Sequence, residues 1–250
     1  MVTVENLTVS YRQHPALHHI SGSFATGSLT AVIGPNGSGK STLLKSIMGL
    51  LRPAGGHVTV KATRPRIAYL PQLTDIDRSF PMSVRDCVLL GYWSAVGAWG
   101  RVTPALLHRA AAAIQEVGLT GFEQRVVGSL SSGQLQRVLF ARLMVQEADL
   151  ILLDEPFNAM DSRTTDALLT LIHRWHAEGR TVIAVLHDDE QVRQHFSQTV
   201  LLARELVAWG DTATVLTTPN LQRARALAEA WDDHADICRT DELPVPRKVA

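Results

Sequence analysis

Short apolar runs recur along the chain, and turn residues or helical stretches separate them. The clearest runs cover residues 31–33, 67–70, 150–153 and 181–186. A short, unbroken apolar run is typical of a strand buried on both faces, as in a parallel sheet. Residues 2–4 and 7–9 instead alternate apolar with polar side chains, which predicts a half-buried strand. Further strands are predicted at residues 57–60, 200–202 and 207–209.

Segments of helical composition fill several intervals between these runs. Predicted helices cover residues 42–48, 84–96, 104–117, 131–146 and 162–178, and a helical tail starts at residue 221. Thr103 followed by Pro104 marks a helix start, because proline favours the first helical position after a cap residue. Gly118 is placed to end that helix, and Ser162 is predicted to cap the helix that begins there. Strands that alternate with helices predict an α/β fold.

A glycine-rich segment lies between the first apolar run and the first helix. It reads G-P-N-G-S-G-K-S-T and fits the phosphate-binding pattern G-x-x-x-x-G-K-[ST]. The glycines let several backbone N–H groups converge on one anion, and the following helix adds the positive end of its dipole. Lys40 is expected to reach the β- and γ-phosphates, and the Ser41 hydroxyl to ligate Mg²⁺. The predicted ATP-binding residues of this loop are Gly34, Pro35, Asn36, Gly37, Ser38, Gly39, Lys40, Ser41 and Thr42.

Two neighbouring carboxylates, Asp154 and Glu155, follow the apolar run at residues 150–153. Ligands of an open α/β sheet bind at the carboxyl ends of its strands, so both are candidates for a nucleotide site. Asp154 suits Mg²⁺ coordination, and Glu155 suits general-base work on a water molecule. The phosphate loop alone fits a kinase, a GTPase or a transport motor, but a kinase or small GTPase does not need this pair.

Two further polar residues stand where predicted strands end. Gln72 follows Pro71 after residues 67–70, and a neutral amide there could ligate Mg²⁺ or hold a water molecule. His187 follows the run at residues 181–186, where it could contact a γ-phosphate. Taken alone, Gln72 would pass as a loop residue and His187 as a core histidine.

A segment reading L-S-S-G-Q begins the predicted helix that ends near residue 146. A serine at a helix start is usually an N-cap. The same geometry, with free N–H groups and a hydroxyl, also makes an anion site. The segment consists of Leu130, Ser131, Ser132, Gly133 and Gln134.

Several aromatic and histidine residues allow more than one interpretation. Tyr11, which follows the first predicted strand, could stack on an adenine base or be an ordinary strand tyrosine. Three aromatics of the helical region could belong to the core or form an exposed docking surface, namely Tyr92, Trp93 and Trp99. Three histidines are interpreted as surface or packing residues, since neighbours in a strand point to opposite faces, namely His14, His18 and His19.

Composition narrows the class of protein. The 250 residues suffice for one large domain, or for a domain with a smaller insertion. Lys plus Arg and Asp plus Glu number 24 each, so a global basic excess is absent and we expect no nucleic-acid partner. Cys87 and Cys238 lie far apart, and no signal peptide or membrane-spanning run is visible. These features predict a cytoplasmic protein that reaches a membrane only through a partner.

In their order along the chain, these motifs resemble those of the ATPase subunit of an ABC transporter. The resemblance covers nearly the whole chain and adds Y-L-P-Q at residues 69–72, D-E-P at 154–156 and N-A-M-D at 158–161. It implies a P-loop NTPase (RecA-like) core with a small antiparallel β-subdomain and an inserted α-helical subdomain. The implied divisions of one ABC ATPase domain are 1–72 and 149–220 for the core, 73–148 for the helical subdomain and 221–250 for a C-terminal helical tail.

The resemblance also implies a role for each single residue at the nucleotide. Tyr11 would stack on the adenine of ATP. Gln72 would be the glutamine of the Q-loop, and with Ser41 and Asp154 it would hold Mg²⁺. Glu155 would be the catalytic base, and His187 the switch histidine.

Two motifs would act across a dimer. The segment at residues 130–134 would be the signature, which closes over ATP bound by a second copy in an ATP-sandwich dimer. Asp161 would belong to the D-loop that crosses this dimer. The usual signature is L-S-G-G-Q, and here Ser132 replaces its first glycine. A serine costs little there unless the backbone needs a positive φ.

The resemblance extends to the transported substrate. Residues 80–88 and 186–188 are similar to segments in importers of zinc, manganese or iron, and residues 12–22 to bacterial zinc-importer ATPases. The implied partners are an integral membrane permease and, indirectly, an extracytoplasmic metal-binding protein. The implied location is the cytoplasmic face of the inner (plasma) membrane. Alternatives are a manganese or iron-chelate importer, an ABC exporter, and a non-transport ABC ATPase, which would carry coiled-coil insertions or tandem domains.

Overall fold

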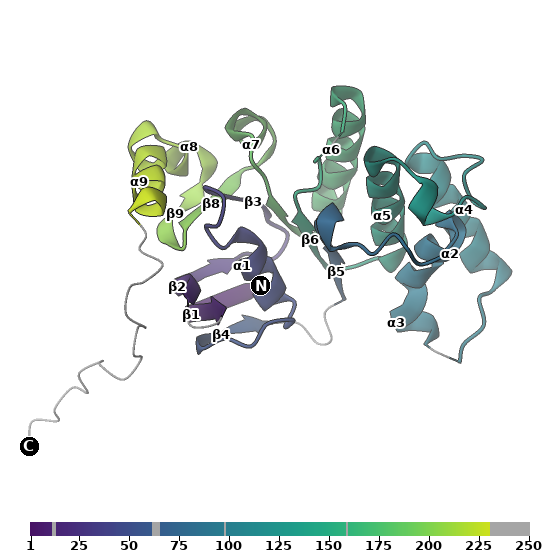
Figure 1. The fold of residues 1–250 in the computed structure, drawn as a ribbon, viewed down its shortest axis with the longest axis horizontal. Helices are drawn as coiled ribbons and strands as arrows, with labels where there is room; N and C mark the ends of the chain where they lie inside the picture. Colours follow the sequence, from purple (N-terminus) through teal and green to yellow (C-terminus); the bar gives the residue numbers. More distant parts are fainter. Residues whose placement is uncertain (12–13, 62–65, 98, 159, 231–250) are drawn as a thin grey trace, which may run out of the picture.

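The computed structural model describes residues 1–11, 14–61, 66–97, 99–158 and 160–230. Within these ranges the chain forms a three-stranded sheet and a six-stranded sheet, with helices packed around them (Figure 1). None of the helices in the described ranges is long and apolar enough to cross a membrane. Cys238 and the last part of the predicted C-terminal tail lie outside the described residues.

The three-stranded antiparallel sheet comes from the N-terminal part of the chain. Its order is β2-β1-β4, with β1 at Val2–Tyr11, β2 at His14–Phe24 and β4 at Gly55–Val60. The apolar members of the alternating N-terminal pattern are all buried, namely Val2, Val4, Leu7 and Val9. The half-buried strand is therefore confirmed, and it pairs with the strand predicted near residues 57–60.

The six-stranded sheet has the order β5-β6-β7-β3-β8-β9. Its strands are β3 (Leu29–Ile33), β5 (Ile67–Leu70), β6 (Leu150–Asp154), β7 (Thr181–Val185), β8 (Gln198–Ala203) and β9 (Glu205–Asp211). All neighbours pair in parallel except β8 and β9, which are antiparallel. Every residue of β3, β6 and β7 is buried, which explains why these strands appear in the sequence as unbroken apolar runs.

The helices gather toward the two ends and the faces of this sheet. In the described residues they are α1 (Lys40–Ile47), α2 (Val84–Leu89), α3 (Trp93–Val96), α4 (Pro104–Glu116), α5 (Ser132–Gln146), α6 (Ser162–Ala177), α7 (Asp189–His195), α8 (Thr212–Val215) and α9 (Thr218–Glu229). Figure 1 shows α2–α5 at one end of the molecule and α8 and α9 at the other. Helices α2, α4 and α5 pack together, and α5 also contacts the edge strand β5.

Alternate residues of the parallel strands point into two separate cores. In β6, Ile151 and Leu153 belong to a core that includes side chains of α2, α4, α5 and α6. Leu150 and Leu152 belong to a second core, shared with α1 and the three-stranded sheet. Burial of one such side chain stabilises the fold by about 1.5–3 kcal/mol. Packing on both faces therefore holds the end of β6, and Asp154 with it, in a defined position.

The helix predicted at residues 84–96 is interrupted. Helix α2 is followed by a 3₁₀ turn at Leu90–Tyr92 before α3 begins. Gly91 lies in this turn, and a Cβ there would lie 2.4 Å from Val145 Cγ2 and 2.5 Å from the Arg142 carbonyl oxygen. The backbone of the turn thus packs directly against α5, and a side chain at position 91 would not fit.

The exposure of the three aromatic side chains in this region decides between their two interpretations. Tyr92 is only 7% exposed and belongs to the core. The docking-surface interpretation is therefore wrong for Tyr92. Trp93 is 59% exposed and Trp99 is 98% exposed, so these two remain candidates for a contact surface.

Two helix starts test the predicted caps. Thr103 caps α4 by accepting a hydrogen bond from the Leu106 N–H, as predicted. Ser162 is not the cap of α6, because it is already the first helical residue. Asp161 caps this helix by accepting a hydrogen bond from the Thr164 N–H at 2.8 Å, and this bond holds the pKa of Asp161 below its ordinary value.

Candidate functional site

The glycine-rich loop connects β3 to the N-terminus of α1, as the sequence predicted. Gly34, Gly37 and Gly39 have φ angles of 150°, 76° and 91°. A Cβ on Gly34 would lie 2.0 Å from the Leu202 carbonyl oxygen, and one on Gly39 would lie 2.4 Å from the Ala16 carbonyl oxygen. These two positions therefore accept only glycine, which lets the loop pack against the backbone of β8 and β2.

Two polar side chains of the loop are placed where they could bind an anion. The Ser38 hydroxyl is buried and has no hydrogen-bond partner among the described residues. Lys40 donates to the carbonyl oxygens of Gly34 and Pro35 at 2.9 and 2.8 Å. Burial lowers the pKa of Lys40, while the nearby carboxylates Glu155 and Asp154 oppose this shift. A buried ammonium in a glycine-rich loop fits a bound phosphate, because the negative charge of the phosphate would stabilise the positive charge of Lys40.

A cavity of about 960 Å³ opens beside this loop. Its size is in the range of pockets for small molecules and cofactors. Tyr11, at the end of β1, lines the cavity and is 48% exposed, so its ring is available to a base. The other lining residues are Ala16, Asn36, Gly37, Ser38, Gly39, Lys40, Ser41, Thr42, Gln72, Glu155, Phe157, Asn158, Thr165, Val185, Leu186, His187, Asp188 and Gln191.

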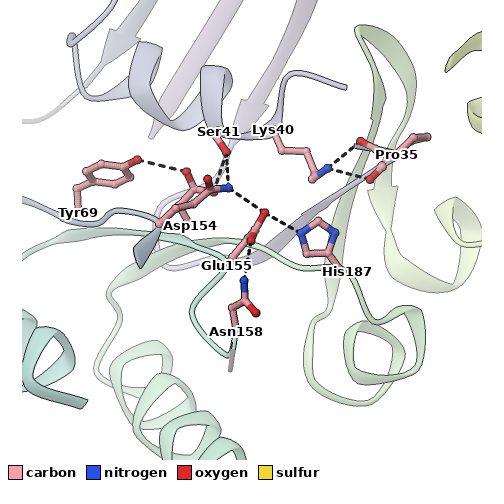
Figure 2. Close-up of polar contacts among 10 residues, drawn as sticks. Pro35, Lys40, Ser41, Tyr69, Asp154, Glu155, Asn158 and His187 are labelled. Atoms are coloured by element: carbon pink, nitrogen blue, oxygen red, sulfur yellow. Dashed lines mark hydrogen bonds and ion pairs between the residues drawn. The ribbon is translucent and has the colours of Figure 1, made fainter. Parts of the chain in front are cut away.

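Asp154 lies at the end of β6 and has no exposed surface. Its Oδ1 accepts a hydrogen bond from the Ser41 hydroxyl at 2.9 Å, and its Oδ2 accepts one from the Tyr69 hydroxyl at 3.2 Å (Figure 2). Burial raises the pKa of Asp154, and the two hydroxyl donors oppose that shift. Burial and the Asp154 charge also raise the pKa of Tyr69 well above its ordinary value, so its hydroxyl keeps the proton that it donates.

Three side chains converge on the carboxylate of Glu155. Gln72 Nε2 donates to its Oε1 at 2.8 Å, and His187 Nε2 lies 2.8 Å from the same oxygen. Asn158 Nδ2 donates to its Oε2 at 3.3 Å (Figure 2). The backbone of Glu155 is left-handed, with a φ of 51°, a conformation that costs a non-glycine residue about 1–3 kcal/mol. This conformation turns the side chain away from the buried strand and into the cavity beside the phosphate loop.

The oxygen atoms here also fit a magnesium ion. Mg²⁺ prefers hard oxygen ligands, and the Ser41 hydroxyl and the Asp154 carboxylate lie within hydrogen-bond distance of each other. Gln72 is close as well, but its Nε2 faces Ser41 at 3.2 Å. Direct coordination by Gln72 therefore requires its amide to turn, so that the oxygen faces the metal.

The signature segment lies elsewhere on the same chain. Ser131 and Gln134 form a capping box at the start of α5, with hydrogen bonds of 3.2 and 3.0 Å. Together with Asp161 these residues line a hollow of about 290 Å³, which shares no residue with the cavity at the phosphate loop. The phosphate-loop site and the signature segment are thus two separate places on the surface of one chain.

Ser132, the departure from the usual signature, fits its place without strain. It is the first residue of α5 and is not among the described residues with positive φ. Its hydroxyl accepts a hydrogen bond from Arg78 at 3.2 Å, a contact that a glycine could not make. This bond connects the start of α5 with the segment that follows Gln72.

A sequence profile named ABC transporter matches residues 17–158 of this chain. The chain belongs to this family. It is 42% identical to the zinc transport system ATP-binding protein TroB of Treponema pallidum, over 89% of this chain and 86% of that protein. It is 38% identical to the manganese transport system ATP-binding protein MntB of Listeria monocytogenes, over 88% and 94%. The dimeric structure of a bacterial ABC transporter cassette matches with a TM-score of 0.76 and 25% identity, over 85% and 99%.

As a member of the ABC transporter family, the chain is an ATPase, and the predicted P-loop NTPase fold is confirmed. His187 is 46% exposed, so the core interpretation of this histidine is wrong, and it faces Glu155 instead. The histidines near the N-terminus have ordinary partners: His18 contacts Glu205, and His19 contacts Asn6. No group of three or more His, Cys, Asp or Glu side chains in the described part of the chain is arranged to hold a metal ion.

The sequence did not assign a role to two residues that the ABC ATPase site contains. Tyr69 contacts Asp154, and Asn158 contacts Glu155. Both belong to motifs that the sequence singled out, Y-L-P-Q and N-A-M-D. Their position beside Gln72 and Asp161 in these motifs was therefore the signal that could have identified them. Other cavity residues, such as Thr165 and Gln191, belong to no motif and could be found only from the fold.

Proposed function

We propose that this chain is the ATP-hydrolysing subunit of an ABC importer for a transition metal ion, and that the ion is zinc. The observation that supports hydrolysis is the convergence of Gln72, His187 and Asn158 on the Glu155 carboxylate, beside the phosphate loop. Support for the metal comes from the relatives, since one is named for zinc and another for manganese. A manganese or iron-chelate importer is the alternative.

In this proposal each of the predicted site residues has one task in the binding or hydrolysis of ATP. Lys40 and the loop N–H groups bind the β- and γ-phosphates, and Tyr11 stacks on the adenine. Ser41, Asp154 and Gln72 hold Mg²⁺, which neutralises charge on the phosphates. Glu155 removes a proton from the attacking water, and His187 contacts the γ-phosphate.

We also propose the division of the chain into parts. Residues 1–72 and 149–220 form the core with the β-subdomain, residues 73–148 the helical subdomain, and residues 221–250 the C-terminal tail. The packing of α2, α4 and α5 against one another supports the helical subdomain. Helix α9 begins at Thr218, three residues before the proposed start of the tail.

Three partners follow from this function. A second copy of the chain completes each ATP site with its signature, Ser131 and Gly133, and with Asp161. A membrane permease holds the subunit at the cytoplasmic face of the inner membrane. An extracytoplasmic metal-binding protein delivers the ion to that permease, and no nucleic acid takes part.

The proposed substrate is tested by metal uptake in cells. Deletion of the gene should reduce uptake of radioactive zinc to near background, and a plasmid copy of the wild type should restore it. The Lys40→Ala variant should fail to restore uptake, because the phosphates lose their buried cation. If manganese uptake falls and zinc uptake does not, the alternative substrate is correct. If neither falls, the metal-import proposal is wrong.

The exposed tryptophans are tested as the contact with the permease. Trp99→Glu and Trp93→Glu should weaken binding of the permease by roughly 30-fold or more, as loss of a central aromatic contact costs about 2 kcal/mol. ATP hydrolysis by the isolated subunit should persist, since both side chains lie outside the cavity. Leu50→Glu is the matched control, because Leu50 is also exposed, at 60%, but follows α1. Unchanged permease binding in both tryptophan variants would place the contact elsewhere.

A further inference from the structure

The carboxylate of Asp154 is held by two hydroxyl groups from different parts of the chain. Ser41 at the start of α1 donates to Oδ1, and Tyr69 of β5 donates to Oδ2 (Figure 2). Since Asp154 is fully buried, both of its oxygens lie away from solvent. A buried carboxylate needs such donors, because leaving it without them carries a large desolvation cost.

The sheet explains how Tyr69 reaches this carboxylate. Strand β5 pairs in parallel with β6, and Tyr69 stands beside Leu152 in this register. Leu152 and Asp154 are two residues apart in a strand, so their side chains leave the same face of the sheet. The Tyr69 ring packs against the core that contains Leu152, and its hydroxyl extends along this face to Asp154.

The two donors are not equivalent. In the proposed function the Ser41 oxygen is itself a ligand of Mg²⁺, so its position changes with the state of the metal site. Tyr69 lies on a strand and does not line the cavity, so a nucleotide in the cavity would not contact it directly. Outer groups that hydrogen-bond a ligating carboxylate fix its orientation, and their loss typically weakens metal affinity by about 10–100-fold.

We propose that Tyr69 is a positioning residue, whose hydroxyl orients the Asp154 carboxylate toward the Mg²⁺ that accompanies ATP. This inference rests on the proposed role of Asp154 as a magnesium ligand. The aromatic body of Tyr69 contributes to the core, and a phenylalanine would preserve that part. Only the hydroxyl group of Tyr69 acts on the metal site, through its hydrogen bond to Asp154.

The test measures how binding of a fluorescent ATP analogue to the full-length protein depends on Mg²⁺. Tyr69→Phe should raise the half-saturating Mg²⁺ concentration about tenfold. Binding of the analogue in EDTA should stay as in the wild type, because the phosphate loop and Tyr11 are unchanged. Hydrolysis at saturating Mg²⁺ should recover to near the wild-type rate, since the Glu155 site is intact.

Two further variants separate this role from a structural one. Tyr92→Phe removes the hydroxyl of another buried tyrosine, outside the cavity, and should leave the Mg²⁺ requirement unchanged. In an Asp154→Asn background, Tyr69→Phe should add no further shift, because the carboxylate that it orients is gone. An unchanged Mg²⁺ requirement in Tyr69→Phe, or an equal loss of binding in EDTA, would overturn the proposal. If Asp154→Asn alone leaves the requirement unchanged, the assigned role of Asp154 is wrong as well.

Discussion

Replacement of Glu155 by glutamine should lower ATP hydrolysis by about 10²–10⁴-fold, the usual contribution of a positioned general base. Glutamine keeps the size of the side chain, and its amide oxygen can still accept the hydrogen bond from Gln72, but it cannot accept a proton from water. Glutamate and glutamine carry the same conformational cost at the φ of 51° found at position 155, so the fold should be unaffected. Phosphate release measures the loss, and titration with a fluorescent ATP analogue should show that nucleotide binding persists.

The control for this experiment is Glu229→Gln. It makes the same chemical change at an exposed position at the end of α9, remote from the cavity. This variant should hydrolyse ATP at the wild-type rate. Unchanged turnover in Glu155→Gln would show that another group takes the proton, and the assigned role of Glu155 would have to be abandoned.

The second large effect concerns the dimer. Lys40 and Ser41 line the cavity at the phosphate loop, Asp154 contacts Ser41, and the signature of the same chain lines a separate hollow. The start of α5 carries the positive end of a helix dipole, and in a second copy it could face the γ-phosphate. The Glu155→Gln variant, which binds ATP without splitting it, should therefore accumulate as an ATP-bound dimer in size-exclusion chromatography.

Adding Gly133→Asp to that variant should abolish the dimer, because a carboxylate would then face the γ-phosphate of the partner site. Gly133 is the second residue of α5, where an acidic side chain favours the helix dipole, so the monomer should fold normally. Nucleotide binding by the monomer should stay nearly intact, as Gly133 does not line the cavity at its own phosphate loop.

Gly133→Asn is the matched control for this charge. It has nearly the same shape as aspartate and carries no charge, so it should impair the dimer much less. A Gly133→Asp double variant that still forms the dimer with ATP would rule out a shared site. Loss of ATP binding by the monomer would instead place Gly133 in its own chain's site.

Hydrolysis would then open such a dimer. In the proposed dimer, the negative charge of ATP would lie between the phosphate loop of one copy and the helix start of the other. Cleavage of the γ-phosphate removes that bridge, and the two copies can separate. The exposed Trp93 and Trp99 would transmit this motion if they form the proposed contact with the permease.

Much of the fold could be predicted from the sequence, for local reasons. Strands β3, β6 and β7 are buried on both faces, and their residues are therefore mostly apolar. The phosphate loop is recognisable because its backbone turns through positive φ angles at Gly34, Gly37 and Gly39, a local demand that glycine meets at little cost. The cap at Thr103 likewise depends on hydrogen bonds within one helical turn.

The candidate site was predicted in part, because its members end strands that could be recognised. Asp154, Glu155, Gln72 and His187 were all singled out, but their contacts with one another were not. His187 resembled a core residue because the run before it is buried, yet it is exposed and pairs with Glu155. No pattern within the run could show that the chain turns outward at this residue.

The sequence by itself determined the buried strands, the phosphate loop and the order of the motifs, because each depends on backbone sterics and burial over a few residues. Only the tertiary structure decided which side chains meet. Where the backbone of Gly91 packs against α5, Tyr92 is buried in the core and the neighbouring Trp93 is exposed. Tyr69 reaches Asp154 because β5 and β6 are neighbours in the sheet, although these residues are 85 positions apart. Strand order and helix packing are set by the combined burial of both cores, and no short segment contains that information.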